Sequence, residues 1–370
     1  MTSALFSPIA LRGLTLPNRI VVSPMAQYSA QDGCAGDWHL VHLGQLSCSG
    51  AGLLMTESTA IEAEGRGSLS CLGLYGEPQA QALKRVIDFC RLHGSAQLGV
   101  QLTHTGRKGS IRAPWAGRGT LPVAEGGWNV VAPSALAFDA NSPLPTALEQ
   151  DGLQRIKQGF VAAAERAVHI GFDVIELHAA HGYLLHQFLS PLSNQRVDAY
   201  GGDAARRMRY PLEIAAAVRA VVPDHKALGL RISAGDWCEG GTSLDEAVAF
   251  AGALKDIGCD YVCVSSGGLV ANQQIKVSPG YQVPFAAAVK QSTGMPTRTV
   301  GMITHAQQAE QIVSTGQADM VAIGRAMLDN PRWGWHAAQA LGAKVGYPPQ
   351  YERCSAAVWP GAKLLRPDPQ

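Results

Sequence analysis

Short, almost continuously apolar runs alternate along this chain with segments whose apolar residues recur every three or four positions. The runs cover residues 19–23, 53–57, 97–102, 173–177, 227–232, 260–265, 297–300 and 319–323. Runs that are apolar throughout are typical of parallel strands buried on both faces, and the amphipathic segments between them are typical of helices. The pattern therefore predicts eight successive β/α units.

Two of the predicted helices carry the clearest signals. Residues 154–170 place apolar side chains on one helical face, namely Ile156, Phe160, Ala163, Ala164 and Ala167. A second helix is predicted from Ser243 to Asp256, where Ser243 and Glu246 match a capping box. The spacing of both patterns supports helices between the predicted strands.

Eight β/α units favour a closed (β/α)₈ TIM barrel over an open sheet, and such a barrel takes ~250 residues. The surplus is expected in excursions at residues 103–150 and 266–282, after the third and sixth strands, and in a tail at 331–370. The segment before Arg19 is expected to cover the bottom of the barrel. No linker is evident, so residues 1–370 are predicted to form one domain.

Composition narrows the class of protein. The chain has 370 residues, 46% of them hydrophobic, and a net charge of +1, which gives no electrostatic reason to expect a nucleic-acid or membrane partner. No apolar run approaches the ~20 residues of a membrane helix, and no secretory signal is visible at the N-terminus. The 8 cysteines form no C-x-x-C pair, so reduced, packed thiols and a cytoplasmic location are expected.

Two imidazoles and a phenol follow the run at 173–177, at His178, His181 and Tyr183. In a parallel barrel, the carboxyl ends of the strands carry the chemistry. Neutral histidines can hold a substrate oxygen, and a tyrosine with a pKa near ~10 can deliver a proton at neutral pH. The trio therefore predicts an enzyme that acts on a polarised double bond.

The last two strands end in glycine, which predicts a phosphate site. Gly301 follows one strand, and Gly324 with Arg325 follows the other and leads into a helix. Glycine lets the backbone approach a phosphate, and a helix N-terminus offers free N–H groups. No G-x-G-x-x-G fingerprint with a following acidic residue is present, so a mononucleotide is favoured over a dinucleotide.

Polar residues inside two predicted strands also need partners. Arg231 lies within an apolar strand, where a guanidinium is costly unless it meets an anion or a strong acceptor. Gln101 lies in another strand. A flavin would use both, the arginine at its anionic edge and the amide at its pyrimidine edge. The alternative for Arg231 is a buried ion pair that links layers of the barrel.

These residues resemble the old yellow enzymes, FMN-dependent ene-reductases, and most closely their thermophilic-like branch, class II. The resemblance runs from Leu16 to about Trp333. Its motifs are Ser23-Pro24-Met25-Ala26-Gln27-Tyr28-Ser29, Gln101-Leu102-Thr103-His104-Thr105-Gly106-Arg107-Lys108, the segment from His178 to Tyr183 with Phe188-Leu189-Ser190-Pro191, Tyr200-Gly201-Gly202 and Gly324-Arg325-Ala326. The single domain is therefore expected to bind FMN.

The resemblance implies a role for each matching position. Flavin contacts are implied for Ser23, Pro24, Met25, Ala26, Ala60, Gln101 and Arg231, and phosphate contacts for Gly301, Gly324 and Arg325. The substrate's carbonyl or nitro oxygen would lie on His178 and His181, and the proton would come from Tyr183. Tyr28 would line the substrate pocket, Lys108 would lie near the flavin and the substrate, and Arg353, with Trp359 as a second candidate, would reach into the site of a partner subunit.

One position departs from the branch in a way that matters. The branch usually carries cysteine directly after Pro-Met, where this chain has Ala26. That thiol is neither nucleophile nor acid, so hydride transfer should survive. We expect an altered flavin potential and a slightly larger pocket. Thr103 and Thr105, on either side of His104, are lesser departures.

The implied activity is an NAD(P)H-dependent reduction of activated C=C bonds in α,β-unsaturated carbonyl or nitro compounds. Hydride would come from flavin N5 and the proton from Tyr183, with NADPH or NADH as reductant and a homodimer or homotetramer as the assembly. One alternative is a flavin-binding redox protein with weak activity, since the cysteine is missing. Another is a metal-dependent hydrolase or lyase that uses Glu176, His178 and His181. The expectation for His39, His42 and His104 is ordinary packed or surface imidazoles.

Overall fold

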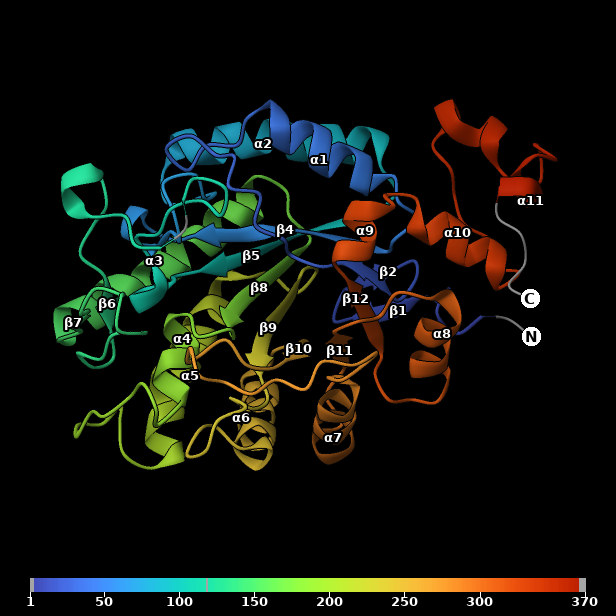
Figure 1. Cartoon of the computed structure of the whole chain (residues 1–370). Helices are drawn as coiled ribbons and strands as arrows, with labels where there is room; N and C mark the ends of the chain where they lie inside the picture. The colour runs from blue at the N-terminus through green and yellow to red at the C-terminus, as the bar shows by residue number, and fades with distance from the viewer. Residues whose placement is uncertain (1–2, 118, 366–370) are drawn as a thin grey trace.

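The computed structural model describes residues 3–117 and 119–365 and shows one closed barrel surrounded by helices (Figure 1). The first two and last five residues of the predicted domain, and so the end of the predicted tail, lie outside the described residues. The barrel contains β3 (Ile20–Val22), β4 (Leu53–Ala60), β5 (Gln97–Thr103), β8 (Val174–Ala179), β9 (Ala227–Ser233), β10 (Tyr261–Ser265), β11 (Thr297–Val300) and β12 (Met320–Ile323). Each strand pairs in parallel with its neighbours, and β12 closes onto β3. The predicted TIM barrel is confirmed.

Helices follow the strands as the alternating pattern predicts. They are α1 (Asp37–Ser47), α2 (Glu77–His93), α3 (Gln150–His169), α4 (Leu184–Leu189), α5 (Ala204–Val221), α6 (Leu244–Ile257), α7 (Val283–Thr293), α8 (Ala306–Ser314), α9 (Arg325–Asp329), α10 (Trp333–Ala340) and α11 (Ala362–Leu365). Short 3₁₀ turns are η1 (Ala63–Gly65), η2 (Gly106–Lys108), η3 (Val123–Glu125) and η4 (Pro349–Cys354).

The two helices with the clearest sequence signals are present. α3 begins four residues before its predicted start and buries the predicted apolar face against the barrel. At the start of α6, the Ser243 hydroxyl accepts a hydrogen bond from the Glu246 N–H, and the Glu246 carboxylate accepts one from the Ser243 N–H. The predicted capping box is therefore confirmed.

Strand boundaries differ from the prediction at two places near the site. β4 continues to Ala60, past a register irregularity between Met55 and Ser58. β8 continues to Ala179, so His178 belongs to the strand instead of following it. Both extensions end in polar or small residues, which the apolar pattern could not assign to a strand.

The bottom of the barrel is closed by a hairpin of β1 (Ile9–Leu11) and β2 (Leu14–Leu16). Leu11 and Leu16 are buried in one cluster with inward-facing residues of the barrel strands, including Leu53 and Val174. The segment before Arg19 therefore covers the barrel bottom, as expected.

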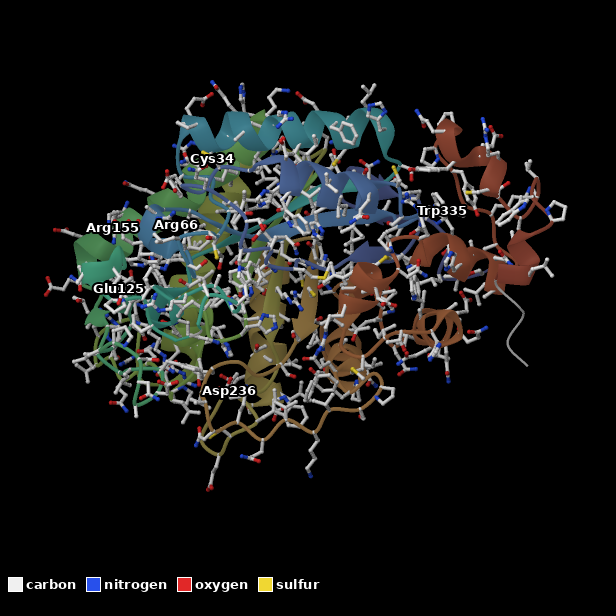
Figure 2. The ribbon with its side chains drawn as sticks, turned by 45° about the horizontal axis from the view of Figure 1, so that its top comes forward. Cys34, Arg66, Glu125, Arg155, Asp236 and Trp335 are labelled. Atoms are coloured by element: carbon white, nitrogen blue, oxygen red, sulfur yellow. The ribbon has the colours of Figure 1, made fainter. Side chains whose placement is uncertain are left out.

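The excursions are long loops with little regular structure. The first carries η2, η3 and a two-stranded sheet of β6 (Val131–Ala132) and β7 (Thr146–Ala147), and the second connects β10 to α7. Figure 2 shows Glu125 of the first excursion on the opposite side of the molecule from Trp335 of α10. Among the described residues, all eight cysteines are unpaired, and no helix is long and apolar enough to cross a membrane.

Candidate active site

The end of β8 and the turn that follows it bring the predicted catalytic trio together. The His178 Nδ1 accepts the Ala180 N–H at 3.2 Å, which fixes the ring at the strand end. His181 takes the left-handed conformation, with φ +58, and Tyr183 is the N-cap of α4. A Cβ on Gly268 of the second excursion would lie 2.5 Å from the His181 Cα. Glycine is therefore required where this excursion packs on the turn.

The imidazoles of His178 and His181 face one another. The His178 Nε2 and the His181 Nδ1 are 3.2 Å apart, and the ring centroids are 5.0 Å apart. Burial, together with the positive charge of Arg231, lowers the pKa of both histidines well below the usual value. Both rings are therefore neutral at physiological pH, and each carries one N–H donor.

Tyr183 stands beside this pair. Its ring centroid is 4.7 Å from that of His178, and the side chain keeps partial exposure. Burial raises the pKa of Tyr183, with the neighbouring Cys71 and Tyr28 acting in the same direction. The phenol is therefore protonated across the physiological range, which is the state a proton donor requires.

Lys108 binds the backbone of the catalytic turn. Its Nζ donates to the His181 carbonyl at 2.8 Å and to the Gly268 carbonyl at 2.7 Å, and it lies 5.6 Å from the Tyr183 ring centroid. Burial, with the charge of Arg107, lowers the pKa of Lys108 to about 8. The structure thus places Lys108 next to the trio, where it joins the first excursion to the second; contact with flavin or substrate remains a prediction.

Arg231 is a buried cation without an acid partner among the described residues. The side chain is 7% exposed, its Nη1 lies 3.4 Å from the Ser23 hydroxyl, and its Nε has no hydrogen-bond partner. A buried guanidinium in this state fits an anionic ligand. The ion pair considered as the alternative forms elsewhere, between Arg298 and Glu176. This orphaned cation beside Ser23 fits the anionic edge of a flavin.

The predicted phosphate end lies at the neighbouring strands. Gly324 is the N-cap of α9, exposed Arg325 begins that helix, and a Cβ on Gly324 would lie 3.6 Å from the Met25 sulfur. Gly301 has φ +113, a conformation that glycine adopts without strain. Burial raises the pKa of Tyr281, and the charges of Arg325 and Arg231 act in the opposite direction. The two arginines therefore lie near Tyr281, on the same side of the barrel as Gly324.

Positions 26 and 28 lie on the accessible side of the site. Ala26 is exposed, and the next residue, Gln27, donates its N–H to Glu57 at 3.1 Å. Tyr28 has φ +50 and packs edge-on against Trp115 of the first excursion, at 5.7 Å between centroids. The flavin contact of Ala26 and the substrate contact of Tyr28 remain predictions.

Three predicted residues have other contacts in the structure. The Gln101 amide donates to Glu176 at 2.8 Å, inside the barrel. Ala60 is buried at the end of β4. Arg353 is exposed on η4, whose Tyr351 packs against Trp335. Their contacts with FMN, or with a partner's site in the case of Arg353, remain predictions.

Glu176 is engaged away from His178 and His181. Its carboxylate is fully buried, forms an ion pair with Arg298, and accepts the Tyr261 hydroxyl at 2.8 Å. Among the described residues, no group of three His, Cys, Asp or Glu is arranged as a metal site. The bonds of Glu176 therefore oppose the alternative that uses it as a ligand with the two histidines.

The other histidines have structural partners, as expected. His39 contacts the buried carboxylate of Glu57 at 3.2 Å, and His104 contacts the partly buried carboxylate of Glu62 at 2.9 Å. Burial, with the charge of His39, lowers the pKa of His42 to about 4. None of the three histidines is joined to the catalytic trio by these bonds.

Sequence reasoning missed four polar residues that contact or support the turn. Ser265 and Gln282 hydrogen-bond in series behind His181, and His186 and Asp236 form a buried ion-pair contact beneath it. Asp236 is labelled in Figure 2. A polar residue at the end of a predicted strand, as at Ser265, and a histidine inside an apolar helical segment, as at His186, were the available signals.

Comparison with known proteins gives the family. A profile of the NADH:flavin oxidoreductase / NADH oxidase family matches residues 4–343. The chain belongs to this family. It is 43% identical over 353 residues to an NADPH dehydrogenase of Listeria innocua, covering 95% of this chain and 99% of that protein. It is 41% identical over 355 residues to an NADPH dehydrogenase of Geobacillus thermodenitrificans, with the same coverage.

A solved structure supports the same assignment. Morphinone reductase superimposes with a TM-score of 0.77 at 28% identity, covering 95% of this chain and 93% of that one. The chain is thus an old yellow enzyme family member, and the recognition from its motifs is confirmed. It is an FMN-dependent oxidoreductase, and the unpaired Arg231 fits that cofactor.

Proposed function

We propose that this enzyme reduces activated C=C bonds of α,β-unsaturated carbonyl or nitro compounds. The observation that carries the proposal is the facing pair of neutral imidazoles, His178 and His181, beside the protonated phenol of Tyr183. N–H donors aimed at one point stabilise an oxygen on which negative charge develops. A hydroxyl within the same site supplies the proton that completes the reduction.

The roles of the protein groups follow from their positions. His178 and His181 bind and polarise the substrate oxygen, and the charges of partly buried Lys108 and buried Arg231 favour the enolate or nitronate that forms there. Tyr183 holds the proton that goes to the α-carbon. When bound, FMN supplies the hydride for the β-carbon. Ser23 and Arg231 hold its anionic edge, and Gly301, Gly324 and Arg325 hold its phosphate.

NADPH is the proposed reductant, with NADH as the second candidate. The curated relatives from Listeria innocua and Geobacillus thermodenitrificans are both named NADPH dehydrogenase. Tyr28 lines the proposed pocket, and Ala26 leaves more room above the flavin than the usual cysteine. The expected consequence of Ala26 is a changed flavin potential with substrate reduction retained.

A half-reaction assay tests the proposed function. The purified holoenzyme is reduced anaerobically with NADPH or NADH, then mixed with cyclic enones, maleimides and nitroalkenes while flavin absorbance is followed. Rapid reoxidation by an enone, with the saturated ketone as product, is expected. Flavin that accepts electrons from NADPH but is not reoxidised by any of these compounds would favour a redox protein with weak activity.

The His178→Ala substitution tests the oxygen clamp itself. Loss of one donor to a developing oxyanion typically costs ~2.7–4 kcal/mol of transition-state stabilisation, equivalent to about 10²–10³ in kcat. We expect enone reduction to fall by that factor while FMN content is unchanged. Undiminished enone turnover in His178→Ala would remove this residue from the mechanism.

We also propose a homodimer or homotetramer in which Arg353 enters the partner's site. The support is its exposure on η4, at the end of the molecule where α10 carries Trp335 (Figure 2). Mixing an Arg353→Ala enzyme with a Tyr183→Phe enzyme tests this. Hybrid dimers would contain one intact composite site, so partial recovery of activity is expected; no recovery after demonstrated subunit exchange would contradict the proposal.

A further inference from the structure

A continuous series of hydrogen bonds runs from the catalytic turn into the next loops. The Ala180 N–H donates to the His178 Nδ1, and the His178 Nε2 contacts the His181 Nδ1. The His181 Nε2 lies 2.8 Å from the Ser265 hydroxyl, which lies 3.1 Å from the Gln282 Oε1. Each link joins groups in direct contact.

The backbone sets the direction of this series. Because the His178 Nδ1 accepts an N–H, the single proton of this neutral ring is on Nε2 and points at the His181 Nδ1. The His181 Nδ1 must then be an acceptor, and its own proton is on Nε2, pointing at Ser265. The Ser265 hydroxyl in turn donates to Gln282.

This arrangement suits only one kind of ligand oxygen. A ligand oxygen that replaces the contact between the two rings meets one donor, the His178 Nε2–H, and one acceptor, the His181 Nδ1. A hydroxyl group, which both donates and accepts, satisfies the two nitrogens. A carbonyl, enolate or phenolate oxygen only accepts, so it requires the His181 proton on Nδ1.

The neighbouring side chains allow that second arrangement at little cost. If the Ser265 hydroxyl turns from Gln282 to the His181 Nε2, it becomes the donor there, and His181 holds its proton on Nδ1. The Gln282 Oε1 keeps a donor in both states, because the Ser266 hydroxyl also bonds to it at 2.7 Å. Both serines are buried, at 3% and 5% exposure. Each serine hydroxyl has a hydrogen-bond partner in both arrangements.

We infer that Ser265 is a positioning residue whose hydroxyl selects the tautomer of His181, so that the histidine pair presents two N–H donors to an acceptor-only oxygen. The inference rests on the proposed function and names the residue that makes its oxygen clamp complete. The ring stays neutral: one proton leaves Nε2 and one arrives at Nδ1 by exchange with water. Ser266 is the auxiliary donor that frees Ser265 to turn.

Two ligands that share a phenol ring but differ in the protonation of its oxygen test the inference in the oxidised holoenzyme. The probes are phenol, which is neutral and can donate, and the phenolate of 4-hydroxybenzaldehyde, which only accepts. Binding of each is followed by the change in flavin absorbance. The variants are Ser265→Ala and Ser266→Ala, with Ser265→Thr as the matched variant that keeps the hydroxyl.

The expected result is selective. Ser265→Ala and Ser266→Ala weaken phenolate binding by about tenfold, the effect of one hydrogen bond to a charged group, and leave phenol binding unchanged; Ser265→Thr behaves as the parent enzyme. In ¹⁵N-histidine spectra of the parent enzyme, the His181 proton moves from Nε2 to Nδ1 when phenolate binds, with the signal assigned by its loss in His181→Asn.

Four results distinguish failure of the inference from failure of the proposed function. If Ser265→Ala weakens the binding of both probes equally, the serine has only a structural role and the inference is overturned. A His181 proton that stays on Nε2 in the phenolate complex would also overturn it. If Ser265→Ala does not retain FMN, Ser266→Ala gives the same discrimination. A parent enzyme that shows the tautomer change but reduces no enone would refute the proposed function and leave the Ser265 inference standing.

Discussion

At the scale of single residues, the site is a set of neutral donors inside a positive environment. Partly buried Lys108 and buried Arg231 lie near the trio and have no acid partner among the described residues. His178 and His181 are neutral because of their own burial and these charges. A positively charged site without neighbouring carboxylates stabilises any anion that forms in it. This explains how neutral imidazoles can stabilise an enolate.

The Tyr183→Phe substitution should separate proton delivery from flavin reduction. We expect enone turnover to fall by about 10²–10⁴, the usual contribution of a general acid, while anaerobic reduction of the flavin by NADPH is unchanged. Since burial raises the pKa of Tyr183, its proton is retained at alkaline pH, and any loss of enone turnover in the parent enzyme above pH 8 should follow the loss of charge on Lys108, whose pKa is about 8. Stopped-flow measurement of both half-reactions checks this; equal loss in the two would assign Tyr183 a structural role.

Arg231→Met should weaken flavin retention more than it weakens folding. Removing an unpaired buried cation relieves a desolvation cost in the free protein and removes the anion partner in the holoenzyme. We expect the FMN dissociation constant to rise at least about tenfold, the effect of losing one hydrogen bond to a charged group, with the melting temperature of the FMN-free protein unchanged or higher. Arg298→Met is the contrasting variant, because that arginine has a carboxylate partner. Normal FMN affinity in Arg231→Met would contradict the placement of the flavin.

The sequence predicted which residues form the site better than it predicted their partners. The spacing of His178, His181 and Tyr183 at a strand end was sufficient, because a turn keeps near neighbours together. The pairing of Arg298 with Glu176 was not predictable, because it joins β11 to β8 across the barrel interior and depends on register. The same reasoning that raised an ion pair for Arg231 applied equally to Arg298, which lies in the buried strand β11.

At the scale of elements, α4 and the loop after β9 hold the catalytic turn. The His186 Nδ1 accepts the Gly182 N–H at 2.9 Å, and its Nε2 lies 2.9 Å from the Asp236 carboxylate. Asp236 also accepts the Ser190 hydroxyl and the Thr242 N–H, each at 2.7 Å. The loop after β9 thereby fixes the start of α4, and with it the position of Tyr183.

Acid should release this support. Burial alone would raise the pKa of Asp236, but the charge of His186 and the hydrogen bonds outweigh it, and the pKa falls to about 2. A carboxyl whose folded pKa is depressed stabilises the fold above its ordinary pKa of ~3.9, and this stability is lost as pH falls toward 2. We expect Asp236→Asn to lower the free energy of unfolding by about 3–5 kcal/mol near neutral pH. Between pH 4 and 2, the free energy of unfolding of the variant should depend less on pH than that of the parent enzyme. Chemical denaturation at a series of pH values, with exposed Asp245→Asn as control, checks both. A pH dependence in this range equal to that of the parent would contradict the role given to Asp236.

The capping box of α6 gives a prediction that is independent of the site. Removing the Ser243 hydroxyl leaves the Glu246 N–H without its partner, which typically costs ~1 kcal/mol. Ser243→Ala should lower unfolding stability by that amount without changing activity. Ser314→Ala, at an exposed serine near the end of α8, should change neither. Equal stability of the two variants would show that the cap contributes nothing.

Whole strands were predictable because burial on both faces leaves a continuous apolar run. The eight runs match the eight barrel strands within about one residue at most ends, and the exceptions are the carboxyl ends of β4 and β8. The end of β4 carries the polar residues Ser58 and Thr59, and the end of β8 carries His178 of the catalytic trio. At β8, function thus disturbs the apolar pattern at the position where the chemistry is found.

At the scale of the whole molecule, a buried polar layer crosses the barrel below the site. Glu176 of β8 bonds to Gln101 of β5, Tyr261 of β10 and Arg298 of β11. Four strands are joined through one carboxylate, and both charged groups are fully buried. The attraction within such a pair is offset by the large cost of removing both charges from water, so the net contribution of the pair to stability is small. Breaking the pair is costly, because it leaves one buried charge unpaired.

That asymmetry makes a prediction for the barrel as a whole. Arg298→Met, which leaves the Glu176 carboxylate buried without its cation, should lower the free energy of unfolding by about 3–5 kcal/mol, whereas Arg298→Met combined with Glu176→Gln should recover most of that loss. The measurement is a double-mutant cycle by chemical denaturation of the holoenzyme, with FMN content determined for each variant. Because this layer lies below the site, the double variant should also keep enone reduction. A double variant that is as unstable as Arg298→Met alone would mean that the ion pair stabilises the barrel outright.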